Sequence, residues 1–180
     1  LHGSLLPRYR GAAPINWAII NGEKETGVTT FLLKHEIDTG DLLFQQSIPI
    51  GPDETAGELH DRMMHVGAQL VLQSVQALER GNARPFPQAD TEVSHAPKIF
   101  HETGKLDFSK NTESVHNLVR GLSPYPGAWT MLDGKTLKVL RTRRLPAESG
   151  TQPGAFYSDG KHYLQVGTGD GRIDLLEIKP

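Results

Sequence analysis

The sequence predicts an α/β domain followed by a mainly β domain, and three observations support this fold class. Apolar runs typical of strands alternate with helical patterns up to about residue 84. Pro85, Pro87 and Pro97 then mark a stretch with few apolar residues, which indicates a semi-extended linker. Beyond it, three Asp-Gly pairs separate β-rich runs, as hairpin turns do. We therefore expect domains at 1–84 and 100–180, joined by a linker at 85–99.

The first domain is expected to contain two helices and two strands. A helix is predicted to begin at Pro14, which suits the first helical position, and to end before Gly22. The runs Val28–Leu33 and Leu42–Ile50 are rich in β-branched and apolar residues and indicate strands. A long helix is predicted over Thr55–Arg80. Its expected apolar face consists of Leu59, Met63, Val66, Leu70 and Val75.

The second domain is expected to begin with a helix at Thr112–Leu122 and to continue as strands. These strands are predicted at 129–132, 136–145, 155–157, 163–166 and 173–178. A small Greek-key β-barrel of the OB type accommodates such strands, and its open face often binds oligonucleotides. The alternative is a barrel that only supports the first domain. Five histidines lack the spacing of metal ligands and are expected at the surface: His35, His95, His101, His116 and His162.

The composition excludes several classes of protein. There is no cysteine, so neither disulfides nor thiolate chemistry are available. No apolar run has membrane-spanning length and no signal-peptide pattern is present, so a cytoplasmic protein is expected. Residues 1–97 hold 7 Lys/Arg and 12 Asp/Glu, whereas residues 98–180 hold 12 and 9. The second half is compatible with an anionic partner but is less basic than a dedicated nucleic-acid-binding protein.

Two motifs carry the candidate chemistry. His2-Gly3-Ser4-Leu5-Leu6-Pro7 predicts a structured loop that presents a titratable imidazole. Ile37-Asp38-Thr39-Gly40-Asp41 follows a predicted strand, and a carboxylate there can meet a histidine on a neighbouring loop. Together these motifs resemble the formyltransferase family that uses 10-formyltetrahydrofolate. The stretches 8–17 (RYRGAAPINW) and 25–29 (ETGVT) strengthen the resemblance, which spans most of the chain.

The resemblance implies that His2 and Asp38 are catalytic, with Asp41 only supporting the turn. It also implies that substrate is bound by Ser4, Leu5, Leu6, Pro7 and Gly40, although Ser4 has no adjacent base and is expected to bond to the backbone. An imidazole can donate a hydrogen bond to an oxyanion or relay protons, and a neighbouring carboxylate favours its charged form. The glycine would allow an unusual backbone at the turn. No metal is expected to take part.

The implied activity is transfer of the formyl group of 10-formyltetrahydrofolate, a co-substrate, to the amino group of initiator methionyl-tRNA. The implied fold is the C-terminal part of a Rossmann-like formyltransferase domain followed by a tRNA-binding domain, in a monomer. Two alternatives remain: a formyltransferase that acts on an amino sugar nucleotide, and a non-catalytic RNA-binding module. The candidate tRNA contacts are Arg8, Arg10, Arg141, Arg143 and Arg144. The first two of these could equally brace their own loop.

The family carries an asparagine two residues before the histidine, at a position that would directly precede Leu1. We therefore expect a fragment that lacks the N-terminal half of the catalytic domain, and the sequence leaves open whether the complete protein carries this asparagine. An oriented amide at that place could donate to the same oxyanion as the imidazole.

Overall fold

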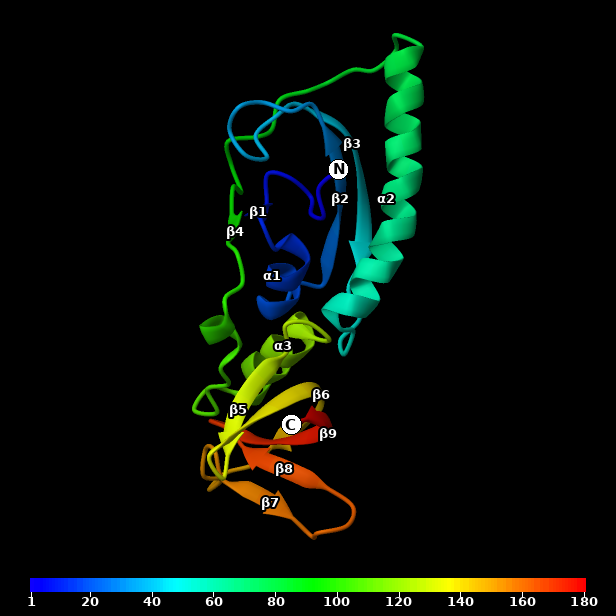
Figure 1. Ribbon diagram of the computed structural model, residues 1–180. Helices are drawn as coiled ribbons and strands as arrows, with labels where there is room; N and C mark the ends of the chain where they lie inside the picture. Colours follow the sequence, from blue (N-terminus) through cyan, green and yellow to red (C-terminus); the bar gives the residue numbers. More distant parts are fainter. The chain divides into compact units, whose positions relative to one another are not determined.

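The computed structural model describes residues 1–180, which form two compact units (Figure 1). Unit 1 comprises residues 1–18, 23–54 and 58–99, and unit 2 comprises residues 19–22, 55–57 and 100–180. None of the helices combines the length and the apolar character needed to cross a lipid bilayer.

Unit 1 begins with the loop that carries His2 and continues into β1, a short strand at Arg10–Gly11. Helix α1 spans Pro14–Ile20 and begins at the predicted proline, whose fixed φ suits this position. Gly22 follows the helix with a φ of 73°, the left-handed conformation that glycine adopts at a helix end. The predicted helix is therefore confirmed to within one residue.

Strands β2 (Glu25–Phe31) and β3 (Leu42–Pro49) form an antiparallel pair, as predicted for this region. The residues from Thr26 to Thr30 are all buried, so neither face of β2 is open to solvent. His2 forms a β-bridge with Thr29 of β2. The strand thus has β3 on one side and the N-terminal loop as a second backbone partner.

The connection between β2 and β3 contains a turn that only glycine can complete. Asp38 has a φ of 57°, which is left-handed and uncommon for a residue with a side chain. A Cβ atom on Gly40 would lie 1.5 Å from the carbonyl oxygen of Leu32. Any larger residue at position 40 would force the backbone apart. Gly40 is therefore required by the packing of the turn that presents Asp38.

Helix α2 (Ala56–Glu79) runs beside β3 in unit 1 (Figure 1). Leu59, Met63 and Leu70 of its predicted apolar face are buried, but Val75 is 54% exposed and its prediction is wrong. A step of five residues from Leu70 leaves the helix face, whereas a step of four stays on it. The buried position is therefore Ser74, whose hydroxyl donates to the Leu70 carbonyl and contacts the Thr30 hydroxyl.

The segment expected as a linker carries more structure than a connector. Phe86 exchanges two backbone hydrogen bonds with Leu42, at 2.7 and 3.1 Å. Further along, β4 (His95–Ala96) pairs in parallel with β1, and the two lie side by side in Figure 1. We call residues 86–97 the strap. The sequence did not reveal it because its proline-rich composition resembles that of a free linker.

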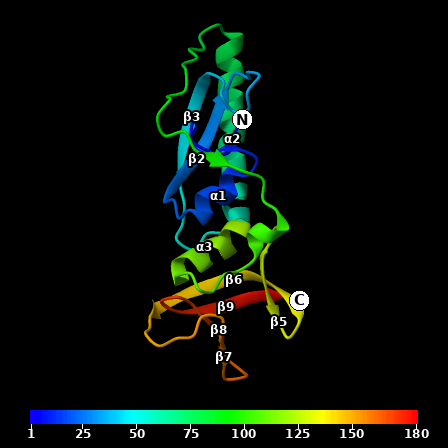
Figure 2. The same cartoon turned by 90° about the vertical axis from the view of Figure 1, so that its left-hand side faces the viewer.

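Unit 2 contains a short 3₁₀-helix at His101–Gly104, the helix α3 (Thr112–Leu122) and one five-stranded antiparallel sheet. The predicted strands are all present, as β5 (Ala128–Leu132), β6 (Lys135–Ala147), β7 (Phe156–Ser158), β8 (Leu164–Gly167) and β9 (Gly171–Lys179). Their order is β5-β6-β9-β8-β7, because β6 pairs with the last strand rather than with the next one. Helix α3 packs on this curled sheet at β6 and β9 (Figure 2).

Two side chains accept hydrogen bonds from the backbone amides at the N-terminus of α3. Asn111 caps the helix by accepting a 2.8 Å hydrogen bond from the Ser114 amide. Asp170, in the third Asp-Gly pair, accepts from both the amide and the hydroxyl of Thr112, at 2.7 and 2.8 Å. The Thr112 amide is the main reason why the pKa of Asp170 lies below its ordinary value. This Asp-Gly pair therefore anchors a helix as well as forming a turn.

The prediction of surface positions holds for four of the five histidines but is wrong for His116. His116 is only 1% exposed, and its Nδ1 lies 2.8 Å from the Thr142 hydroxyl of β6. Val115 and Val119 of the same helix are also buried. A titratable residue on the buried face of a helix is indistinguishable from a surface one when only metal-ligand spacing is considered.

Replacing Asp170 with Ala should lower the free energy of unfolding by about 1–2 kcal/mol, because the first turn of α3 loses an acceptor. Since the folded-state pKa is depressed, the stabilisation is present above the ordinary Asp pKa and is lost as the pH falls through the folded-state value. Urea unfolding of both proteins, at neutral pH and in acid, measures this difference. Asp170→Asn keeps an acceptor oxygen and is the control. A difference that is independent of pH would contradict the assignment.

Candidate functional site

His2 and Asp38, which the sequence places in separate motifs, meet in unit 1. His2 Nδ1 lies 3.5 Å from Asp38 Oδ2, so the expected proximity of the two side chains is confirmed. The backbone fixes the place of the histidine, because His2 and Thr29 exchange amide-to-carbonyl hydrogen bonds of 2.8 and 2.9 Å. His2 is 8% exposed. The pair is therefore nearly enclosed and is held by β2.

The hydrogen bonds of the imidazole distinguish its two nitrogen atoms. Nε2 lies 2.8 Å from the Tyr9 carbonyl oxygen, and because a carbonyl can only accept, Nε2 must carry a hydrogen. Nδ1 then faces Asp38, and it donates to the carboxylate only when the ring is doubly protonated. Nδ1 is consequently the nitrogen at which a proton can be gained or released without breaking the contact with Tyr9.

The carboxylate of Asp38 is held from one side. Its Oδ2 accepts a 2.9 Å hydrogen bond from the Gly11 amide of β1 and is also the atom that faces His2. The side chain is 16% exposed. Both protein contacts use the same oxygen, so Oδ1 is left for a substrate or a water molecule.

The amide of Gln88, in the strap, holds the backbone around Asp38. Its Nε2 donates to the carbonyl oxygens of Asp38 and Gly40, at 2.7 and 2.9 Å. Its Oε1 accepts from Arg10 Nε and Nη2, at 3.1 and 2.7 Å. The role of Gln88 is not apparent from the sequence, because an isolated glutamine in a proline-rich stretch belongs to no motif.

The residues expected to bind substrate have different environments. Ser4 is fully buried and its hydroxyl donates to the Arg8 carbonyl at 2.6 Å, while Leu6 is 3% exposed. Gly40 is also buried. Leu5 and Pro7 are half-buried and reach the surface of the loop. The first three residues are thus placed to shape the loop and the turn, and the last two are placed where a ligand can touch them.

Arg8 and Arg10 both brace their own surroundings. Arg8 forms an ion pair with Glu23, which also accepts a 2.6 Å hydrogen bond from the Tyr9 hydroxyl. The hydrogen bond to Glu23 is the main cause of the raised pKa of the Arg8 guanidinium. Arg10 is held on Gln88. The contacts expected for the bracing role are therefore present. The other role, contact with tRNA phosphates, remains a prediction.

An open cleft of about 470 Å³ adjoins the turn that carries Asp38, although neither His2 nor Asp38 lines it. Gly11, which binds the Asp38 carboxylate, lines this cleft together with Thr39. The remaining lining is mostly apolar with a few charged groups, from Arg10, Ala12, Glu36, Ile37, His95, Ala96 and Pro97. A volume of a few hundred Å³ with few polar groups is typical of small-molecule sites.

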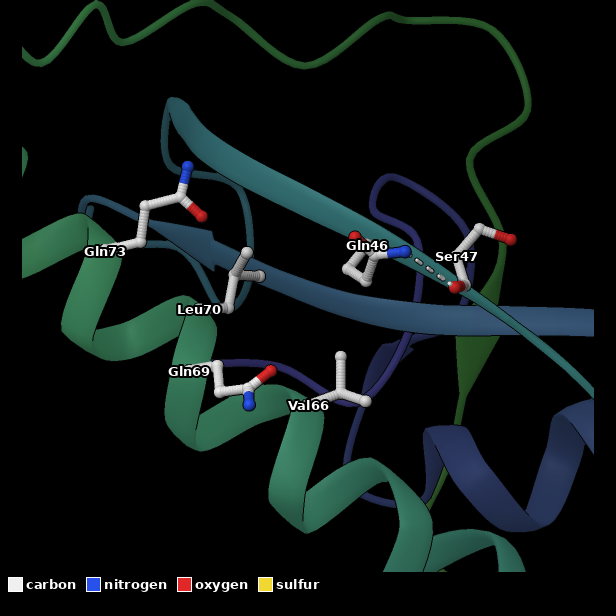
Figure 3. Close-up of a pocket in the computed structure, with 6 residues that line it drawn as sticks. All are labelled: Gln46, Ser47, Val66, Gln69, Leu70 and Gln73. Atoms are coloured by element: carbon white, nitrogen blue, oxygen red, sulfur yellow. Dashed lines mark hydrogen bonds between the residues drawn. The ribbon is translucent and has the colours of Figure 1, made fainter.

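A smaller hollow of about 230 Å³ lies between β3 and α2 and includes none of the predicted site residues (Figure 3). Gln46 and Ser47 line it from β3, and Val66, Gln69, Leu70 and Gln73 line it from α2. The only dashed bond drawn there joins Gln46 Nε2 to the Ser47 carbonyl. No charged or titratable group lines this hollow, so we assign it no role in the chemistry.

The three arginines predicted to bind tRNA in unit 2 are exposed on β6. Two of them face carboxylates on β9. Arg143 donates to Asp174 Oδ2 from Nε and Nη2, at 3.1 and 2.6 Å, and Arg141 lies 3.9 Å from Glu177. Asp174 is 4% exposed. Arg143 therefore has a structural role in neutralising a buried carboxylate, whatever else it binds.

No group of three or more His, Cys, Asp or Glu side chains is arranged to hold a metal ion. An imidazole and a carboxylate in contact can form hydrogen bonds and transfer protons.

Comparison with known proteins places the chain in a family. Its residues 1–75 match the family model for formyl transferase, and residues 98–180 match the model for the formyl transferase C-terminal domain. The chain is 44% identical over 188 residues to the methionyl-tRNA formyltransferase of Bacteroides fragilis, covering 99% of this chain and 58% of that protein. It is 48% identical over 190 residues to the methionyl-tRNA formyltransferase of Azobacteroides pseudotrichonymphae, covering 99% of this chain and 59% of that protein.

The fold is also similar to that of a solved structure, an N-formyltransferase from Helicobacter canadensis in complex with folinic acid and dTDP-3-aminofucose. The TM-score is 0.79 at 24% identity, and the similarity covers 97% of this chain and 64% of the other. The chain thus spans less than two thirds of the length of the relatives it matches. Because both domain models match and the identity extends over nearly all of its residues, the chain belongs to the formyl transferase family.

Proposed function

We propose that the complete protein transfers the formyl group of 10-formyltetrahydrofolate to the amino group of initiator methionyl-tRNA. The observation that carries this proposal is the buried contact between His2 and Asp38, whose turn adjoins an open cleft. Identities of 44% and 48% to methionyl-tRNA formyltransferases support the choice of acceptor. Such an acceptor implies a cytoplasmic enzyme, and we propose that it acts as a monomer.

The reaction requires two proton movements, which the pair can serve. The acceptor nitrogen forms a bond to the formyl carbon, the carbonyl oxygen gains negative charge, and the bond to the folate nitrogen then breaks. The attacking amine loses one proton and the departing nitrogen gains one. Because Nε2 of His2 is engaged with the Tyr9 carbonyl, we assign proton exchange to Nδ1 and to the carboxylate of Asp38. Oδ1 of Asp38 faces no protein donor and can hold a water molecule that relays the proton.

The negative charge on the carbonyl oxygen requires a further donor. In the resembled family, an asparagine two residues before the histidine is placed to supply it. His2 is in an extended conformation, paired with Thr29. Residues two apart in an extended segment point to the same side, so a side chain preceding Leu1 would share the side of the His2 imidazole. Preorganised donors of this kind each contribute about 10²–10³ in rate.

The cleft suits the reacting ends of both substrates. Its apolar part, which includes Ile37, Ala96 and Pro97, can accept an apolar side chain or a ring. Its guanidinium group, on Arg10, can pair with an anionic group, whereas Glu36 adds a carboxylate to the same lining. We propose that Leu5 and Pro7 contact substrate at the surface of the loop, and that Ser4, Leu6 and Gly40 act indirectly by holding the loop and the turn.

Unit 2 is proposed to be an OB-like domain that binds the tRNA. Its curled antiparallel sheet has the strand content of such a domain, and the 98–180 half of the chain carries an excess of Lys and Arg. Arg141 and Arg144 are exposed on β6 and are retained as candidates for phosphate contact. Arg143 is already engaged by a buried carboxylate.

The second candidate acceptor is an amino sugar nucleotide. The fold similarity to an N-formyltransferase solved with dTDP-3-aminofucose favours this alternative. With the complete protein and 10-formyltetrahydrofolate, we expect formylation of methionyl-tRNA with kcat/KM at least about 10²-fold above that for dTDP-3-aminofucose. Formylation of the sugar nucleotide with the higher kcat/KM would favour the alternative. If the complete protein bound tRNA but transferred no formyl group to either acceptor, the result would favour the other alternative, a non-catalytic RNA-binding module.

His2→Ala and Asp38→Asn should each lower the kcat of formyl transfer by about 10²–10⁴, because each removes a group that moves protons in the reaction. Apparent KM values should change little. Matched controls are His60→Ala and Asp61→Asn, which alter an exposed pair of the same composition on α2. Near-normal kcat in His2→Ala, with a folded protein, would overturn the catalytic assignment.

Neutralising Arg141 and Arg144 together should weaken the apparent affinity for tRNA and leave kcat at saturation nearly unchanged. Phosphate contacts release counterions, so the variant should also show a shallower dependence of affinity on salt concentration. Arg143 is left intact, because its removal would leave the buried Asp174 without its cation. The control is Arg80→Gln with Arg84→Gln, two exposed arginines of unit 1. Unchanged tRNA affinity and salt slope in Arg141→Gln with Arg144→Gln would reject β6 as the contact.

A further inference from the structure

We propose that Gln88 is a positioning residue that sets the orientation of the Asp38 carboxylate, and that the strap holds both members of the His2–Asp38 pair. This inference deepens the proposed function, on which its kinetic consequences rest. Gln88 touches neither the imidazole nor the carboxylate. It acts on the backbone of the turn that carries Asp38.

The turn has contacts of its own: the Leu32 amide donates to the Asp41 carbonyl at 2.9 Å, and the Thr39 hydroxyl donates to the Glu36 carbonyl at 3.0 Å. These bonds leave the carbonyls of Asp38 and Gly40 to Gln88. The residues from Leu32 to Ile37 that precede Asp38 are all exposed. Asp38 itself has a left-handed φ of 57°, which a non-glycine residue does not favour. The two donors on Gln88 Nε2 bond to the carbonyl oxygens of residues 38 and 40, one on each side of Thr39. They therefore close the turn in the conformation that points the carboxylate at Gly11 and His2.

Arg10 fixes which end of the Gln88 amide faces the turn. A guanidinium can only donate, so the two bonds from Arg10 Nε and Nη2 identify the facing atom as the amide oxygen. The amide nitrogen is then directed at the two carbonyls, which can only accept. All of the polar atoms in this chain of contacts are matched as donor and acceptor.

The strap also restrains the histidine. Ser94 accepts from the Tyr9 amide through its hydroxyl and from the Arg10 amide through its carbonyl, both at 2.9 Å. Tyr9 is the residue whose carbonyl accepts from His2 Nε2. One segment therefore holds His2 through Tyr9 and Asp38 through Gln88. A shift of about 1 Å between reacting groups can cost about 10² in rate, so such restraint has a kinetic effect.

A simpler role for Gln88 would be to anchor Arg10 at the cleft. Two variants separate the roles. Gln88→Glu keeps an acceptor for Arg10 but loses both donors to the turn, whereas Gln88→Met loses both functions. If Gln88 only anchored Arg10, Gln88→Glu would behave as the wild type. If it positions Asp38, both variants lose activity.

The experiment uses the complete protein and measures kcat and KM for formyl transfer, together with hydrogen exchange at the Gly11 amide. We expect Gln88→Glu and Gln88→Met to lower kcat by roughly 10- to 100-fold with little change in KM. In the Asp38→Asn background the same substitutions should have little further effect, because residues that act through one another are not additive. The control for the new charge is Gln46→Glu, on the exposed part of β3.

Hydrogen exchange provides a readout that does not depend on activity. The Gly11 amide donates to Asp38 Oδ2, so its hydrogen should exchange faster in Gln88→Glu than in the wild type. In Gln46→Glu the exchange rate at Gly11 should equal that of the wild type. Unchanged exchange at Gly11, or a loss of kcat that is equally large in the Asp38→Asn background, would overturn the positioning role. Faster exchange in a protein whose wild type transfers no formyl group would support the role of Gln88 in the turn while rejecting the proposed function.

Discussion

The left-handed backbone at Asp38 is the constraint on which the candidate site depends. An extended or helical conformation there would direct the carboxylate away from the Gly11 amide, to which it is bonded at 2.9 Å. A non-glycine residue in this conformation carries a cost of roughly 1 kcal/mol or more, and it persists only where its surroundings impose it. Here the surroundings are the close packing of Gly40 on Leu32 and the amide of Gln88. The geometry of the pair is thus a property of the turn and the strap, not of the two side chains alone.

Side chains that bond to the backbone take the place of regular secondary structure around His2. The loop from Gly3 to Tyr9 contains no strand or helix, so its buried carbonyls need other partners. The Ser4 hydroxyl donates to the Arg8 carbonyl, and the Thr29 hydroxyl donates to the Ser4 carbonyl, each at 2.6 Å. Gln45 donates to the Leu6 carbonyl at 2.9 Å. These bonds connect the loop to β2 and β3, which explains how an irregular segment can hold an imidazole in one place.

Local patterns in the sequence predicted the helices, the strands and the His2–Asp38 contact, because periodicity, turn residues and a long ordered motif are visible without tertiary structure. These patterns did not predict the role or burial of a residue whose main contact lies far away in the sequence. Gln88 and Ser94 act on residues about fifty and eighty-five positions away, and no local pattern marks them. His116 was misplaced for the same reason, since its burial depends on Thr142 of another element. The predicted burial of Val75 was wrong because Val75 lies five residues after Leu70, and a five-residue step does not stay on one face of a helix.

The charges of the chain show why net charge is a poor guide to the binding of anions. Among the five arginines considered for tRNA, Arg8, Arg141 and Arg143 each face a carboxylate, and Arg10 is held by an amide. A cation that already has an acidic partner gains less from a phosphate, because part of its field is neutralised and the pair must be rearranged. The excess of Lys and Arg in residues 98–180 therefore overstates the charge available for binding. The number of Lys and Arg residues alone therefore does not determine how strongly this chain can bind a polyanion.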